Sequence, residues 1–137
     1  MLYNEIGQEN MMPWKISYIE DLKIIQTVYT QPSNLEELKE AVFANLNIAK
    51  EKQTGLFLAD CSSFTESGKT MDIYELGNFL ELVTKDIKLN IKEAMIEPLN
   101  AKSVGNDLRF FETVAQNRMI KVRVFHNIND AIDWLVN

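Results

Sequence analysis

Residues 56–59 read Leu-Phe-Leu-Ala, a continuous apolar run between Gly55 and Asp60. A run of this kind has no polar face, which is typical of a β-strand that is buried on both sides. Strands buried on both sides occur mainly in parallel sheets, whose neighbouring strands are joined by crossover helices. This short run therefore favours a largely parallel sheet in an α/β fold.

The rest of the chain alternates between strand and helix patterns. Residues 14–19 show the period-two alternation of a strand, and residues 23–30 are rich in β-branched and aromatic side chains, so we expect a hairpin. Further strands are expected at 56–59, 93–99 and 121–126, and helices at 33–52, 71–83, 107–118 and after a cap at Asn127 or Asn129. The expected order is ββαβαβαβα, with five strands, four helices and parallel βα units after the hairpin.

Helix ends and faces can also be predicted. Ser33 and Glu36 match a capping box before the first helix. In the 71–83 helix, one side carries apolar residues, which predicts the face that packs inward: Met71, Tyr74, Leu76, Leu80 and Val83.

The length of 137 residues fits one domain. No linker, internal repeat or low-complexity segment divides the sequence, so we expect a single domain over residues 12–137. Residues 1–11 are polar and lack both the basic start and the apolar centre of a signal peptide. We expect a mobile N-terminal tail there.

Charge and cysteine content exclude several classes of partner and site. The net charge of −6 is repelled by phosphate backbones and anionic lipid, so we expect neither a nucleic-acid nor a membrane-surface partner. No apolar run approaches the roughly 20 residues of a membrane span. The single cysteine, Cys61, cannot form an internal disulfide or a multi-cysteine metal site, and it suits a cytoplasmic protein without a metal or cofactor.

The loop after the apolar run ends in Ser-Gly-Lys-Thr, residues 67–70. A nucleotide-binding P-loop has this ending, but its first glycine is replaced here by Ser63, and Glu66 would repel phosphate. A purely structural interpretation is that Gly68 turns the chain and Thr70 caps the next helix. A third interpretation comes from a family resemblance.

The element order, the length and this acidic polar loop resemble the STAS family, the SpoIIAA-like anti-sigma-factor antagonists. The resemblance implies that Glu66 is the acidic residue of a switch loop and that Ser67 is a serine phosphorylated by a partner kinase. Thr70 is a second candidate phospho-acceptor. The candidate switch loop comprises Asp60, Ser62, Ser63, Phe64, Glu66 and Gly68.

A closer resemblance is to a subgroup of small bacterial proteins with a SpoIIAA-like fold, related in shape to lipid-binding CRAL-TRIO domains. It is carried by MPWKISYIEDLKIIQTVYT, LFLADCSSF, DIYELGNFLE and RFFETVAQNRMIKVRVF, which together cover much of the chain. The CRAL-TRIO relationship implies a cavity between sheet and helices. Much of the apolar content is needed to fill the core of a chain this short, so the sequence disfavours a large cavity.

Polar side chains also follow three of the expected parallel strands. Cys61, Glu97 and His126 stand at carboxyl ends of strands, where ligands of parallel sheets bind, so they form a candidate strand-end pocket. A Cys–His pair is a possible nucleophilic site. The ordinary alternatives are a buried cysteine and a loop histidine.

Taken together, these observations favour a non-enzymatic regulatory or protein-interaction module of the STAS type, with possible switching near Ser67. The alternative is a small apolar-ligand or lipid-binding module. The first strand, if it lies at the edge of the sheet, needs cover, which self-association as a homodimer would provide.

Overall fold

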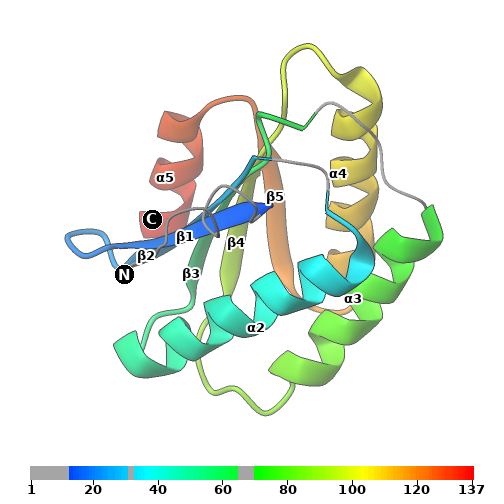
Figure 1. The fold of residues 1–137 in the computed structure, drawn as a ribbon. Coiled ribbons are helices and arrows are strands. Elements are labelled where there is room, and N and C mark those ends of the chain that lie inside the picture. Colours follow the sequence, from blue (N-terminus) through cyan, green and yellow to red (C-terminus); the bar gives the residue numbers. More distant parts are fainter. Residues whose placement is uncertain (1–12, 31–32, 65–69) are drawn as a thin grey trace.

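The computed structural model describes residues 13–30, 33–64 and 70–137, with Thr70 described by its backbone alone. They form one five-stranded sheet in the order β1-β2-β3-β4-β5, with helices on both of its faces (Figure 1). The elements are β1 (Trp14–Ile19), β2 (Ile24–Tyr29), α2 (Leu35–Lys52), β3 (Leu56–Asp60), α3 (Thr70–Thr84), β4 (Lys92–Ile96), α4 (Lys102–Gln116), β5 (Lys121–Phe125) and α5 (Ile128–Val136). The expected order ββαβαβαβα is confirmed, while the expected tail lies outside the described residues.

The sheet is mixed, as the sequence predicts. β1 and β2 form an antiparallel hairpin in which Trp14 lies opposite Tyr29 and Ile19 lies opposite Ile24. β2, β3, β4 and β5 are parallel to one another. β3, which contains the apolar run, is the central strand, and β1 lies at one edge.

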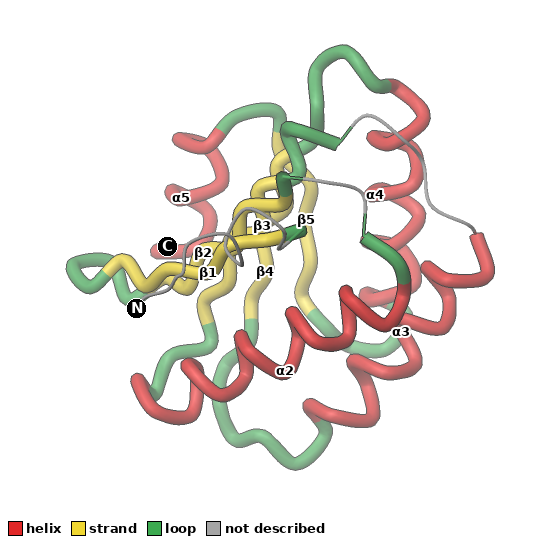
Figure 2. The backbone as a smooth tube through the Cα atoms, in the orientation of Figure 1, coloured by secondary structure: helices red, strands yellow, loops and turns green. Residues whose placement is uncertain are grey.

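Helices α2, α3 and α4 lie on one side of the sheet, and α5 lies on the other (Figures 1 and 2). Phe57 of β3 packs on the α2 side, whereas Leu58 packs with Ala131 and Leu135 of α5. Phe57, Leu58 and Ala59 are all buried. The run is therefore covered on both faces, which explains its lack of polar residues.

Several boundaries differ from the expected ones. The capping box of α2 is formed by Asn34 and Glu37, one residue beyond the expected Ser33 and Glu36. The Asn34 Oδ1 accepts a hydrogen bond from the Glu37 N–H at 2.8 Å, and the Glu37 Oε1 accepts one from the Asn34 N–H at 3.0 Å. Asparagine and serine are both good caps, so sequence alone does not separate the two registers.

The expected 107–118 helix begins five residues earlier, at Lys102, and the strand expected at 93–99 is already over at Ile96. The first turns of α4 hold Ser103, Gly105 and Asn106, which are weak helix formers and obscure the helical pattern. The turns form because Val104 is buried in the core between the sheet and α4. At the C-terminal end, Asn127 caps α5, as expected, by accepting a hydrogen bond from the Asp130 N–H at 2.9 Å.

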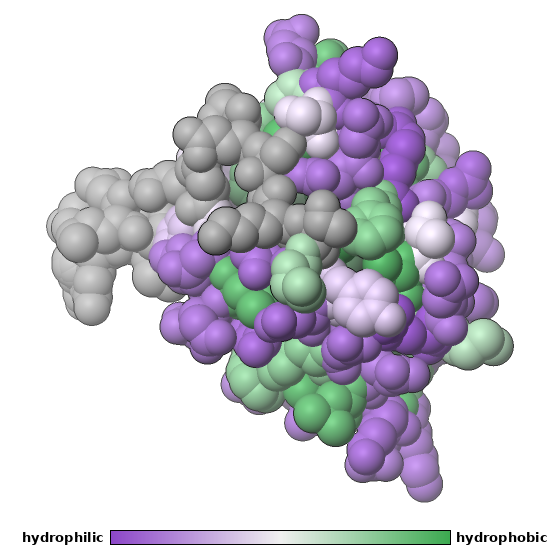
Figure 3. All heavy atoms as spheres, turned by 90° about the vertical axis from the view of Figure 1, so that its right-hand side faces the viewer, coloured by the Kyte–Doolittle hydropathy of each residue, from purple (hydrophilic) through white to green (hydrophobic). Residues whose placement is uncertain are grey.

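The expected inward face of α3 is partly wrong. Leu76 and Leu80 pack against the core, but Met71 and Tyr74 keep 67% and 50% of their surface exposed. The face formed by α3 and α4 is largely hydrophilic, with apolar side chains in smaller patches (Figure 3). None of the helices in the described part of the chain has the length and apolar character needed to cross a membrane.

Candidate functional site

The described part of the candidate switch loop is held by local contacts. The Asp60 Oδ1 accepts hydrogen bonds from the Ser62 N–H at 3.0 Å and from the Ser62 hydroxyl at 2.6 Å. Ser63 is exposed, and the Phe64 ring packs against the Tyr29 ring with centroids 5.5 Å apart.

The remaining members of the loop, Glu66, Ser67 and Gly68, lie outside the described residues. Thr70 is the first residue of α3, and its side chain is not described. Phosphorylation at Ser67 or Thr70, and the regulatory function that depends on it, therefore stay predictions.

Two of the strand-end candidates, Glu97 and His126, lie together. The Glu97 carboxylate, which follows β4, accepts hydrogen bonds from both terminal nitrogens of Arg109, at 3.0 Å and 2.5 Å. The His126 Nδ1 lies 2.8 Å from the Glu97 Oε2. Gly105 allows this approach, because a Cβ at that position would lie 2.7 Å from the Glu97 Oε1. The cluster joins β4, α4 and the end of β5.

Cys61, the third candidate, lies in a different environment. Its side chain is buried in the core between the sheet and α4, and burial, with smaller effects of Glu93 and Asp60, raises the pKa of its thiol far above the usual range. The thiolate is the nucleophilic form of cysteine, so this environment disfavours a reactive thiol. Among the described residues, His126 pairs with Glu97, and no hydrogen bond joins it to Cys61. Nor do those residues include three or more metal-ligating side chains grouped to hold an ion.

Two adjoining cavities lie between the sheet and helices α2, α3 and α4. The larger has a volume of about 170 Å³ and the smaller about 60 Å³. Both are lined mainly by apolar side chains, and they share four lining residues: Tyr29, Val42, Leu80 and Glu93. The larger cavity extends toward the carboxyl ends of β3 and β4, past Cys61 and Met95, where ligands of parallel sheets bind.

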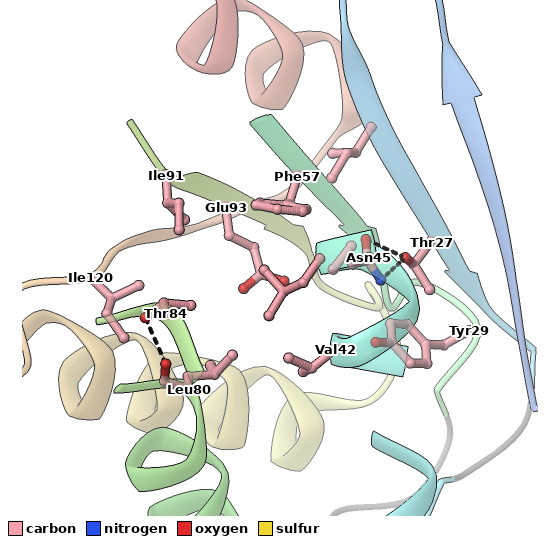
Figure 4. Close-up of a pocket in the computed structure, with 13 residues that line it drawn as sticks. Thr27, Tyr29, Val42, Asn45, Phe57, Leu80, Thr84, Ile91, Glu93 and Ile120 are labelled. Atoms are coloured by element: carbon pink, nitrogen blue, oxygen red, sulfur yellow. Dashed lines mark hydrogen bonds between the residues drawn. The ribbon is translucent and has the colours of Figure 1, made fainter. Parts of the chain in front are cut away.

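Glu93 is the residue that departs most from the apolar character of this space. Side chains alternate along β4, so Glu93 shares a face with Met95, toward α2, α3 and α4. Its carboxylate projects into the cavity between Val42 and Leu80 (Figure 4). No described residue gives it a hydrogen bond or an ion pair. Burial raises the pKa of Glu93 from 4.5 to about 7.

Two further polar atoms in the larger cavity are unsatisfied. The Ser33 Oγ and the Asp107 Oδ2 are buried and have no hydrogen-bond partner among the described residues. By contrast, Thr27 and Asn45 in the smaller cavity bond to each other, with the Asn45 Nδ2 donating to the Thr27 Oγ1 at 2.9 Å (Figure 4). Buried polar groups without partners are rare in proteins, and each calls for a physical explanation.

Sequence reasoning did not single out Glu93 or Asp107. The signal was available for Glu93, because it lies two residues before Met95 in an expected parallel strand, which places the carboxylate on the same face of the sheet as an apolar side chain. No such signal marks Asp107. It stands at the first residue of the expected 107–118 helix, where an acidic side chain is common. Its role depends on where α4 packs.

The comparisons with known proteins add no relative. No protein-family model matches the chain, and neither does any curated protein or solved structure at the level required for a match.

Proposed function

We propose that this chain is a non-enzymatic module that binds a small apolar ligand between its sheet and helices α2, α3 and α4. The observation that carries this proposal is an apolar cavity containing the Glu93 carboxylate, which pairs with none of the described residues. This function is the alternative implied by the resemblance to CRAL-TRIO domains.

The cavity volume limits the size of the ligand. A protein cavity of about 150 Å³ lined by apolar side chains can hold one benzene molecule. The larger cavity here is about 170 Å³, and it adjoins a smaller one across Val42 and Leu80. The space therefore suits one ring or a short chain with a few additional atoms, and not a complete membrane lipid.

The polar groups support a ligand more than an unfilled packing defect. A carboxylate in an apolar cavity costs stability, and a leucine or methionine at residue 93 would fill the same space at no such cost. Ser33 and Asp107 add to the larger cavity two more polar atoms that have no partner among the described residues. A ligand with a matching polar group would satisfy atoms that the described residues leave without partners.

Methyl NMR with toluene as a probe tests this proposal. We expect shift changes at Val42, Leu76, Leu80, Val104 and Leu108, which line the larger cavity, and none at Ala131 and Leu135 of α5, on the other side of the sheet. A Val42→Phe variant, which fills the cavity, should abolish these changes. Val136→Phe, an equal enlargement at a half-exposed residue of α5, is the matched control and should preserve them. Changes spread over both faces of the sheet would contradict the proposal.

We also propose that the chain forms a homodimer through β1. This strand is at the edge of the sheet, and among the described strands it pairs only with β2. An open edge presents unpaired backbone groups that a second copy can satisfy. Sedimentation analysis should give twice the monomer mass. An Ile16→Pro change, which removes a backbone N–H from the open side of β1 and leaves its ladder with β2 intact, should return the monomer. A monomer at all accessible concentrations would refute this proposal.

A further inference from the structure

In the part of the chain that the structure describes, the titratable groups that face the two cavities are all acidic or neutral. β4 contributes Glu93, α4 contributes Asp107, β2 contributes Tyr29, and the segment after β3 contributes Cys61. The described lining residues from α2 and α3 include no titratable group, and none of the described lining residues is a lysine, arginine or histidine. The described lining residues therefore offer negative charge and no positive charge.

This charge pattern disfavours an anionic ligand. A carboxylate or phosphate leaving water for this cavity would lose its hydration and meet Glu93 and Asp107, and no cation among the described lining residues would compensate. A protonated amine would be attracted by these carboxylates. A charge-assisted hydrogen bond from its ammonium group to a carboxylate is roughly twice as strong as a neutral hydrogen bond.

Glu93 is placed to receive such a group from either cavity. It lines both, together with Tyr29, Val42 and Leu80, whereas Asp107 and Ser33 line only the larger one. An apolar body in the larger cavity would lie against Leu76, Leu108 and Phe111 while its polar end reaches Glu93.

From this geometry we infer that the cavity selects small apolar amines, and that the Glu93 carboxylate is the group that binds the ammonium end. This inference rests on the proposed function, since it names the chemical class of ligand for the same cavity. It also gives a reason for an acidic residue at this inward position of β4.

The inference includes a pH dependence. Burial raises the pKa of Glu93 to about 7, so the ionised form is common above neutrality and scarce at about pH 5. An amine that stays protonated over this range needs the ionised form. Its affinity should therefore fall at least about tenfold from pH 8 to pH 5, whereas binding of an uncharged molecule should barely change.

Four probes of similar size test the inference by the same methyl NMR titration: toluene, benzyl alcohol, benzylamine and benzoate. At about pH 8 we expect benzylamine to bind at least about tenfold more tightly than toluene, benzyl alcohol to fall between them, and benzoate to bind most weakly. In Glu93→Gln, which keeps the shape of the side chain, benzylamine should lose this advantage while toluene binding remains. Glu40→Gln, at an exposed residue of α2, is the matched control and should bind like the unchanged protein.

The outcomes separate this inference from the proposed function. If toluene binds in the cavity but benzylamine binds no better, or if Glu93→Gln keeps the advantage of benzylamine, the amine inference is overturned and the apolar-ligand function stands. If none of the four probes moves the cavity methyl signals, both are overturned. Preferential binding of benzoate would also refute the assignment of the ligand class.

Discussion

Replacing Glu93 by glutamine should make the protein more stable at alkaline pH. The carboxyl group has a pKa of about 7 in the folded protein and 4.5 as its ordinary value, because burial disfavours the charged form. At a pH between these two values, the Glu93 carboxyl group is ionised in the unfolded chain but protonated in the folded protein. The folded state thus binds more protons, and its stability falls as pH rises. Glutamine cannot ionise, so the variant lacks this loss.

The two pKa values give the size of the effect. The separation between 4.5 and about 7 corresponds to roughly 3 kcal/mol, at about 1.36 kcal/mol for each tenfold change in proton affinity. The contribution of the Glu93 carboxyl group to the free energy of unfolding is fully present below pH 4.5 and is lost as pH rises through about 7. The Glu93 side chain is only partly buried and solvent screens its charge, so about 3 kcal/mol is an upper limit.

Urea unfolding at a series of pH values measures this difference. The free energy of unfolding of Glu93→Gln minus that of the unchanged protein should increase by up to about 3 kcal/mol from about pH 4.5 to pH 8.5 and then level off. Glu40→Gln, which removes an exposed carboxylate, should give a nearly constant difference. A constant difference for Glu93→Gln as well would show that this carboxyl group is not desolvated, and the reasoning about the cavity would fail.

Three other changes test local features of the structure. Asn34→Ala removes the capping box with Glu37 and should lower the free energy of unfolding by about 1 kcal/mol in urea titrations; an unchanged midpoint would refute the assigned cap. Gly55→Ala places a Cβ 2.8 Å from the Asn90 carbonyl carbon and should cost about 1–3 kcal/mol by the same measurement, whereas a neutral effect would mean that this contact is looser than described. The thiol of Cys61, whose pKa is raised by burial, should react with a chromogenic disulfide reagent only as fast as the protein unfolds, and immediate reaction of the folded protein would contradict its burial.

Much of the fold follows from local sequence patterns. The apolar run at 56–59 needs cover on both faces, and the structure provides it from α2 on one side and α5 on the other. Alternation in 14–19 and β-branched residues in 23–30 predict the hairpin, which the structure confirms. The start of α4 was missed because its helix is held by the burial of Val104, and propensity alone does not reveal tertiary packing.

The candidate site was much less predictable. Cys61, Glu97 and His126 stand at strand ends in the sequence, yet only Glu97 and His126 form a pair. Cys61 is instead buried in the core between the sheet and α4. The cavity depends on how three helices pack over the sheet, which no single segment encodes. The inward position of Glu93 in β4 can be predicted from the sequence. That its carboxylate has no partner among the described residues can be seen only when the surrounding helices are in position.

The most direct test of the account is an NMR titration of the Glu93 side-chain carboxyl carbon, with and without saturating benzylamine. Without a ligand, the pKa of Glu93 should be about 7. With benzylamine, the pKa should fall toward 4.5, the ordinary value, because the bound ammonium group favours the ionised carboxylate. A pKa near 4.5 in the free protein, or one that benzylamine leaves unchanged, would contradict the claim that Glu93 is the ligand-binding group of this cavity.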